Sequence, residues 1–125
     1  MVLSPEERTK ADSFCYQFKS SLSFSWTKTP AYPEINFVNV IASGVSKGKT
    51  LKALAPHLEI ALSEVMAVGD ALNDALLLSV AGLAIAMDNA PDELKAVVDH
   101  VTLDVEHSGL AAAINKFLLQ PQLKL

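Results

Sequence analysis

Two aspartates that follow a short apolar segment are the residues best suited to chemistry in this sequence. Asp70 comes directly after residues 65–69, and Asp74 follows four residues later at the start of an expected helix. Gly69 lets the backbone turn sharply where the apolar segment ends. Because open α/β sheets bind their ligands at the carboxyl ends of strands, both carboxylates can face one crevice. Two such oxygen ligands suit Mg²⁺, which commonly takes one or two carboxylates and fills its other positions with water and phosphate.

The same residues also fit a purely structural interpretation. Asn73 and Asp74 can cap the helix that they precede, because their side chains satisfy free backbone N–H groups and complement the helix dipole. On these residues alone, a magnesium site and a helix cap are equally open.

A lysine lies upstream, at the start of another expected helix. In residues 44–51, Gly-Val-Ser-Lys-Gly-Lys-Thr-Leu, Lys47 stands where exposed backbone N–H groups already favour an anion. Its ammonium group adds a point charge that a phosphate can use. Taken by itself, Lys47 is more typical of a solvated surface residue than of a binding site.

The elements around these residues alternate between strands and helices from position 44 onward. Short apolar strands followed by helices of about ten residues are typical of βαβ units with a parallel sheet. The sequence therefore predicts an α/β fold for residues 44–125, with a domain boundary at the Ser43-Gly44 turn. The expected strands are residues 65–68, 83–87 and 101–103, and the expected helices are residues 48–58, 72–80, 92–98 and 109–119.

The first 43 residues follow a different pattern. Ser4-Pro5-Glu6-Glu7 combines an N-cap, a first-turn proline and a glutamate three positions after the cap, which predicts a helix start. Apolar residues then recur at helical spacing, and Cys15 among them is interpreted as core. Alternation in residues 22–26 and the β-branched and aromatic residues of 34–41 predict an antiparallel pair of strands. Residues 1–43 are therefore expected to form a separate α+β segment.

Composition argues against several classes of function. Half of the residues are hydrophobic and 19% are charged, which disfavours disorder. No run approaches the roughly 18 apolar residues of a membrane helix, and the start lacks the apolar stretch of a signal peptide, so a cytoplasmic protein without a membrane partner is expected. A net charge of −4 without a basic cluster disfavours nucleic acid as a partner. One cysteine and three histidines without ligand spacing disfavour zinc.

The order and spacing of the segments resemble one known enzyme family. Val45-Ser46-Lys47-Gly48, then Gly69-Asp70-x-x-Asn73-Asp74, then Ala-Gly-Leu-Ala-Ile-Ala-Met-Asp-Asn-Ala in residues 81–90 look like the C-terminal part of the Cof-type phosphatases. These belong to the haloacid dehalogenase superfamily and carry a large α/β cap. The resemblance, over about residues 37–119, implies a partial Rossmann-like parallel sheet with flanking helices. Residues 44–125 would be the C-terminal half of the core, and residues 1–43 a remnant of the cap.

The resemblance also implies a role for each residue of the expected site. Lys47 would steady the phosphoryl group, Asp70 would bind Mg²⁺, and Asp74 would support the metal directly or through water. Asn73 would hold the phosphate or the lysine, and Asn89 matches a position near the mouth of the site. The family hydrolyses small phosphorylated metabolites, commonly sugar phosphates, through an aspartyl-phosphate, and the metal and lysine neutralise charge on the phosphoryl oxygens.

Two features depart from the family's pattern. Leu77 stands where methionine usually follows the Asn-Asp pair, a swap of similar volume that should cost little. The family's nucleophile and its acid/base partner are two aspartates separated by one residue, and this sequence has no such pair. Its aspartates are at positions 12, 70, 74, 88, 92, 99 and 104. The 125 residues alone are therefore expected to be inactive.

The absent nucleophile segment leads to an expectation about partners. In the family's sheet that segment lies next to the strand expected at residues 65–68, so this strand should be left as an exposed edge. The sequence thus predicts a homo-oligomer, or a complex with a separate N-terminal half that restores action on a phosphorylated small molecule. The alternatives are a non-catalytic remnant or interaction module, and a plain α/β scaffold in which Asp70 and Asp74 are caps only.

Overall fold

The chain folds as two compact units, Met1–Val45 and Ser46–Leu125, and each is described by itself. The structure is a computed structural model that describes residues 2–3, 7–29 and 31–120. Within those ranges, none of the helices combines the length and the apolar character that crossing a membrane requires.

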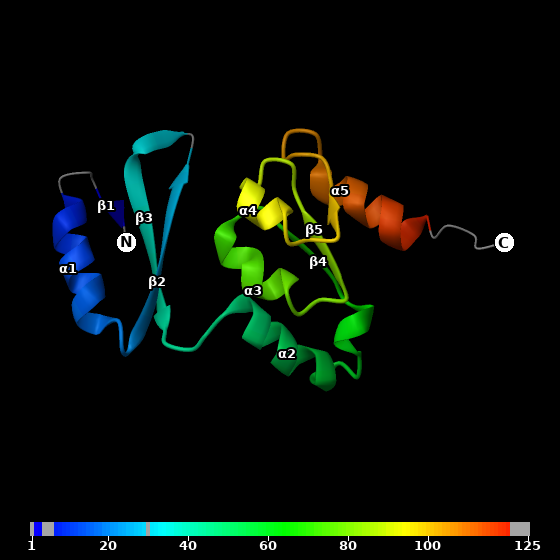
Figure 1. Cartoon of the computed structure of the whole chain (residues 1–125), viewed down its shortest axis with the longest axis horizontal. Helices are drawn as coiled ribbons and strands as arrows, with labels where there is room; N and C mark the ends of the chain where they lie inside the picture. The colour runs from blue at the N-terminus through cyan, green and yellow to red at the C-terminus, as the bar shows by residue number, and fades with distance from the viewer. Residues whose placement is uncertain (1, 4–6, 30, 121–125) are drawn as a thin grey trace. The chain divides into compact units, whose positions relative to one another are not determined.

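The first unit is a three-stranded antiparallel sheet with one helix (Figure 1). It consists of β1 (Val2–Leu3), α1 (Arg8–Phe18), β2 (Leu22–Thr29) and β3 (Tyr32–Ala42), with the strands in the order β1-β3-β2. The ring centroids of Phe14 in α1 and Phe24 in β2 are 6.2 Å apart, and the Arg8 guanidinium carbon lies 4.7 Å from the centroid of the Trp26 ring. The helix therefore packs on the face of the sheet that Phe24 and Trp26 present.

Most of this unit follows the sequence-based prediction. The antiparallel pair is confirmed, and both of its strands extend further than expected toward the turn that joins them. The helix start predicted at Ser4 and Pro5 lies outside the described residues, and within them α1 begins at Arg8. Strand β1 was not predicted, because two residues are too few to show a periodic pattern. Cys15, which was expected in the core, is only partly buried.

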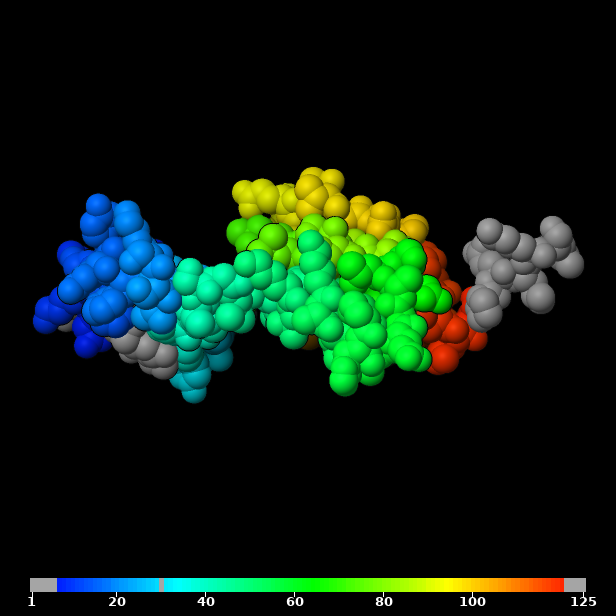
Figure 2. All heavy atoms as spheres, turned by 90° about the horizontal axis from the view of Figure 1, so that it is seen from below, coloured from blue at the N-terminus to red at the C-terminus, as the bar shows by residue number. Residues whose placement is uncertain are grey.

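The second unit is built around a three-stranded parallel sheet, as predicted (Figure 1). Its strands are β4 (Met66–Gly69), β5 (Leu83–Ala86) and β6 (His100–Val101), in the order β4-β5-β6. Its α-helices are α2 (Lys47–His57), α3 (Ala75–Leu78), α4 (Asp92–Lys95) and α5 (Gly109–Ile114). Helix α2 and the segment that follows it cover one face of this unit (Figure 2).

The core of the second unit is made of small and aliphatic side chains from the sheet and its helices. Strand β5 contributes most to it, since Ala84, Ile85 and Ala86 are all buried. Leu78 of α3 and Leu94 of α4 are almost fully buried against that sheet. Because the two central residues of β5 face opposite sides, the sheet is covered on both faces, as is usual for parallel sheets.

Two helices of this unit are shorter than the sequence predicted. The helix expected over residues 72–80 is a 3-10 turn, Leu72–Asp74, followed by the four residues of α3. The helix expected over residues 92–98 ends at Lys95, because the Asp99 backbone N–H already bonds to the Ala84 carbonyl at 2.9 Å where β6 begins. The helix expected over residues 109–119 is α5 continued by a π-helical turn, Asn115–Leu119.

Candidate active site

Lys47 is the first residue of α2, and the local sequence fixes where that helix begins. The Ser46 hydroxyl accepts a hydrogen bond from the Lys49 backbone N–H at 3.2 Å, which is the geometry of an N-cap. Ser46 is extended, with φ −156° and ψ 158°, so the helix cannot start earlier. This places the Lys47 side chain at the amino end of α2, and 55% of that side chain is exposed.

Asp74 is the most completely bonded side chain of the expected site. One carboxylate oxygen forms an ion pair with the Lys47 ammonium group, a contact that the sequence did not predict. The other oxygen accepts hydrogen bonds from the backbone N–H groups of Asp70, at 3.1 Å, and Ala71, at 3.3 Å. Asp74 is 5% exposed. It therefore ties the turn after β4 to the start of α2.

Two glycines make this arrangement sterically possible. A Cβ atom on Gly69 would lie 2.6 Å from the Cβ of Asp74, so only glycine lets the aspartate fold back under the end of β4. A Cβ atom on Gly48 would lie 2.2 Å from the backbone oxygen of Leu76, so only glycine lets α2 approach α3 this closely. Gly48 directly follows Lys47, and Leu76 lies two residues after Asp74. The second contact was not foreseen, because nothing in the sequence indicates which helix Gly48 meets.

The Asp70 side chain, unlike that of Asp74, is not engaged by other described residues. It follows the last residue of β4 and is exposed, and among the described residues its carboxylate has no hydrogen bond or ion pair. Its backbone N–H is held by Asp74, so the direction of the chain at this point is fixed while the side chain is left available. An exposed carboxylate at the carboxyl end of a parallel strand can take a cation or a water molecule bound to one.

The donor set can be compared with what a divalent cation needs. Over the described ranges, there is no group of three or more histidine, cysteine, aspartate or glutamate side chains that could hold a metal ion. Asp70 offers one free carboxylate, whereas both oxygens of Asp74 are already bonded. One free carboxylate is compatible with Mg²⁺, which commonly takes one or two carboxylates from a protein together with water and phosphate, and the donor set does not fit an all-protein cage.

Neither asparagine of the expected site makes a side-chain hydrogen bond to the Lys47–Asp74 pair. Asn73 is exposed, and its side chain has no hydrogen bond to the described residues. The Asn89 side-chain oxygen accepts a hydrogen bond from the Val105 backbone N–H at 3.0 Å, so it links the loop after β5 to the loop after β6. The structure brings Lys47, Asp70 and Asp74 together through direct contacts, and it gives neither asparagine such a contact.

Charged residues beyond the predicted set hold the neighbouring loops. The Lys95 ammonium group donates to the Asp88 backbone carbonyl at 2.9 Å and lies 3.6 Å from the Asp88 carboxylate. In the loop after β6, the Asp104 carboxylate lies 2.6 Å from the His107 ring nitrogen Nδ1. Hydrogen bonds from the His107 side chain and backbone lower the pKa of Asp104 below its usual value. Loop residues that pair three or seven positions apart leave no periodic signal, so these contacts could not be predicted.

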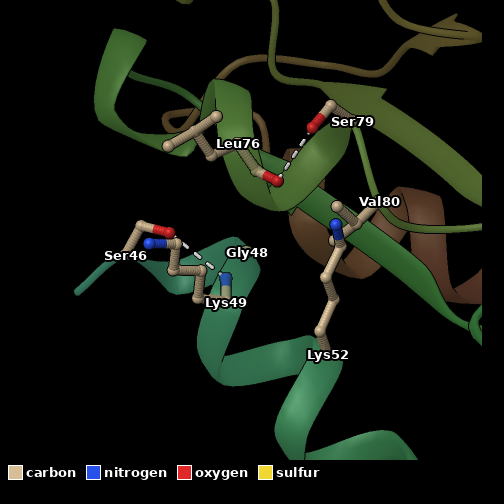
Figure 3. A pocket seen from close by; sticks show the side chains of 7 residues that line it. All are labelled: Ser46, Gly48, Lys49, Lys52, Leu76, Ser79 and Val80. Atoms are coloured by element: carbon tan, nitrogen blue, oxygen red, sulfur yellow. Dashed lines mark hydrogen bonds between the residues drawn. The ribbon is translucent and has the colours of Figure 1, made fainter. Parts of the chain in front are cut away.

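A shallow hollow of about 170 Å³ lies between α2 and α3 on the second unit (Figure 3). Its walls are formed by Ser46, Gly48, Lys49, Lys52, Leu76, Ser79 and Val80. Figure 3 shows the Lys52 side chain extending toward Val80 across it. Lys47, Asp70 and Asp74 do not line the hollow, so it is separate from the three residues brought together at the end of β4.

The sequence matches a known family over nearly all of its length. A family model for haloacid dehalogenase-like hydrolases matches residues 1–114. The phosphatase YwpJ of Bacillus subtilis is 35% identical over 108 residues, which is 81% of this chain and 38% of that protein. The 5-amino-6-(5-phospho-D-ribitylamino)uracil phosphatase YcsE of Bacillus subtilis is 37% identical over 82 residues, 66% of this chain and 33% of that protein.

Solved structures agree with the fold. A Thermotoga maritima protein superimposes with a TM-score of 0.74 at 26% identity, over 92% of this chain and 41% of that one. A subclass IIB sugar phosphatase superimposes with a TM-score of 0.67 at 28% identity, over 92% of this chain and 40% of that one. The chain thus spans between one third and about two-fifths of the length of these relatives.

Proposed function

Because this chain belongs to the haloacid dehalogenase-like hydrolase family, we propose that it supplies the phosphate-binding and metal-binding part of a phosphatase for small phosphorylated metabolites. The observation that carries the proposal is the Lys47–Asp74 ion pair at the end of β4, next to the free carboxylate of Asp70. One relative of known structure is a sugar phosphatase, which supports sugar phosphates as the substrate class.

The three residues have different tasks in this proposal. Lys47 presents a positive charge to the phosphoryl oxygens, where negative charge is spread during transfer. Asp74 is a positioning residue, because it holds the Lys47 ammonium group and the turn at Asp70 without being free to bind substrate. Asp74 would then support the metal indirectly, either through a water molecule or by fixing the position of Asp70. Asn73 and Asn89 are assigned to the rim, where an arriving phosphate or sugar can meet their amide groups.

Asp70 is the residue that would hold Mg²⁺. Its free, exposed carboxylate is a suitable oxygen ligand for this ion, which binds through one or two carboxylates and substrate phosphate. When bound, Mg²⁺ would neutralise charge on the phosphate oxygens. Because Lys47 forms its ion pair with Asp74, the Asp70 carboxylate stays unpaired and available to the ion.

The nucleophile of the proposed reaction lies outside these 125 residues. No two aspartates in the sequence are separated by one residue, and a site that only positions a phosphate cannot form an aspartyl-phosphate. We therefore assign residues 44–125 to the C-terminal half of the catalytic core and residues 1–43 to the end of a cap. The 125-residue chain by itself should release no phosphate from a substrate.

The absence of this aspartate pair also supports a second candidate function. A chain that keeps the Lys47–Asp74 pair and lacks the nucleophile can serve as a non-catalytic binding module. The two functions differ when the remaining part of a haloacid dehalogenase-like chain is co-expressed. The phosphatase part then gains activity, and the binding module does not.

Titration with Mg²⁺, followed by NMR, tests the proposed metal site in the 125-residue chain. The backbone amide signals of Asp70 and Ala71 should shift and saturate, and Asp70→Asn should abolish the shift. Asp92→Asn is the matched control, because the Asp92 carboxylate is fully exposed and lies away from β4 in the sequence. Equal shifts in the wild type and in Asp70→Asn would contradict the assignment.

A further inference from the structure

Lys95 is a partly buried lysine to which the proposed function gives no role. Its ammonium group donates to the Asp88 backbone carbonyl at 2.9 Å, and it lies 3.6 Å from the Asp88 carboxylate and 3.7 Å from that of Asp92. The Lys95 side chain is 26% exposed, whereas that of Lys47 is 55% exposed. Leu94, its neighbour in α4, is buried in the core. Lys95 therefore connects a helix anchored in the core to the loop after β5.

The peptide group between Gly69 and Asp70 is held at both of its polar atoms. Its N–H, which belongs to Asp70, donates to the Asp74 carboxylate at 3.1 Å. Its carbonyl, which belongs to Gly69, accepts from the Met87 backbone N–H at 2.9 Å. Because a peptide group is planar, these two hydrogen bonds fix the direction in which the chain enters Asp70. The loop after β5, which begins at Met87, thus supplies half of the support for the residue that would hold Mg²⁺.

Lys95 makes the shortest contact to the residue that follows Met87. That residue is Asp88, whose backbone N–H reaches the Leu103 carbonyl only at 3.4 Å, whereas its own carbonyl accepts from Lys95 at 2.9 Å. The next anchor of the loop is one residue further on, where the Asn89 side chain is bonded to the loop after β6. A hydrogen bond from a charged donor is stronger than one between neutral groups. Without Lys95, Asp88 would be held by the long hydrogen bond alone.

We propose that Lys95 is a positioning residue for the metal site at Asp70. By holding the Asp88 backbone, it keeps the Met87 N–H on the Gly69 carbonyl. The peptide group before Asp70 then keeps its orientation, and the Asp70 carboxylate stays where Mg²⁺ can bind. This inference rests on the proposed function, which assigns Asp70 to the ion. Residues that orient a metal ligand directly change metal affinity by about 10–100-fold, and Lys95 acts through the loop, so we expect a smaller effect of at least about threefold.

A purely electrostatic role for Lys95 predicts a change of the opposite sign. Asp88 follows β5 at the same edge of the sheet as Asp70 follows β4, and Lys95 neutralises its charge. Removing the ammonium group would leave this edge more negative, and exposed charges act over about 8 Å at physiological ionic strength. Mg²⁺ would then bind more tightly, whereas loss of positioning makes it bind more weakly. The direction of the change in Kd therefore separates the two roles.

Hydrogen exchange of the 125-residue chain without metal gives the first test. In Lys95→Met, which removes the ammonium group and keeps most of the apolar stem, the Met87 amide should exchange at least about tenfold faster than in the wild type. The Thr102 amide, which donates to the Ala86 carbonyl at 2.9 Å between β5 and β6, should keep its protection. Unchanged exchange at Met87 would overturn the proposal. Loss of protection at Thr102 as well would show that Lys95 supports the whole sheet and not the loop, which would also overturn it.

Titration of the same chain with Mg²⁺ at fixed ionic strength, followed by the Asp70 amide signal, gives the second test. Lys95→Met should raise the Kd by at least about threefold. Lys95→Arg keeps a charged donor and should stay within about twofold of the wild type. Asp92→Asn removes only a contact to a fully exposed carboxylate and should also stay within about twofold.

The results separate this inference from the proposed function. No shift of the Asp70 signal in the wild type would refute the metal site itself, and the role of Lys95 with it. A wild-type shift whose Kd is unchanged or lower in Lys95→Met would refute only the role of Lys95. Equal weakening by Lys95→Met and Lys95→Arg would also refute it, because the charged donor would then not be what holds the loop.

Discussion

Replacing Asp74 by alanine should destabilise the second unit more than any other single change in the proposed site. The substitution removes the partner of the Lys47 ammonium group and the shared acceptor of the Asp70 and Ala71 backbone N–H groups. Hydrogen bonds to charged groups contribute about 1.5–3 kcal/mol each, but they are not additive, and water can reach the turn at Asp70 once the carboxylate is gone. We expect a loss of about 2–4 kcal/mol in the free energy of unfolding.

Two further variants provide smaller losses in the free energy of unfolding with which the loss for Asp74→Ala can be compared. Lys47→Ala should cost about 1 kcal/mol or less, because the lysine side chain is more than half exposed and Asp74 keeps both backbone donors. Asp92→Ala should change stability by less than about 0.5 kcal/mol, because its carboxylate is fully exposed and its ion pair with Lys95 spans 3.7 Å. The order Asp74→Ala, Lys47→Ala, Asp92→Ala follows from burial and from the number of bonds lost.

Urea unfolding, read separately for the two units, measures these losses. NMR signals of β5 report the second unit, and Trp26 fluorescence reports the first unit, which contains the only tryptophan. Asp74→Ala should lower the midpoint of the β5 signals and leave the Trp26 transition in place. If Asp74→Ala costs no more than Asp92→Ala, the carboxylate is not the link between α2 and the end of β4, and the reasoning about Lys47 fails.

Two other predictions concern packing and pH. Gly48→Ala should destabilise the second unit by at least about 1 kcal/mol, although alanine favours a helix. The reason is that the alanine Cβ would lie 2.2 Å from the Leu76 backbone oxygen. Urea unfolding measures the change, and a gain in stability would contradict the close approach of α2 to α3. The Asp104 carboxyl has a lowered pKa because of the His107 hydrogen bonds, so its stabilising contribution is present above the ordinary aspartate pKa and is lost as the pH falls through the lowered value. A carboxyl ¹³C titration should show His107→Ala raising that pKa, and an unchanged value would refute the assigned cause.

The sequence predicted the parts of this molecule that depend on short-range patterns. The turn at Gly69-Asp70, the parallel sheet and the helix start at Lys47 are each carried by a few neighbouring residues, and all three are found. The lengths of α3 and α4 were wrong. For α4 the reason is a tertiary effect, because pairing where β6 begins stops a helix whose pattern could continue.

The different contacts of Asp70 and Asp74 could not be predicted from the sequence either. The sequence predicted that Asp70 binds the metal and that Asp74 supports it directly or through water. Only the fold shows that the Lys47 ammonium group, 27 positions away, occupies one oxygen of Asp74. The cap interpretation was wrong as stated, because the Asp74 side chain makes no capping hydrogen bond to the helix that follows it. Asp74 accepts instead from the backbone N–H groups of Asp70 and Ala71, which precede it, and it also holds Lys47. The binding-site interpretation stays a prediction.

The most direct test of the proposed site is phosphate release by the complemented protein. The 125-residue chain is co-expressed with the remaining part of YwpJ, and hydrolysis of an aryl phosphate is measured with Mg²⁺ present. Lys47→Ala and Asp70→Asn should each lower kcat by about 10²–10³, the usual loss when one charge-stabilising group is removed, and Lys52→Ala in the separate hollow should leave kcat within about twofold. A complex whose turnover is unaffected by both Lys47→Ala and Asp70→Asn would contradict the assignment of these residues to phosphate and metal.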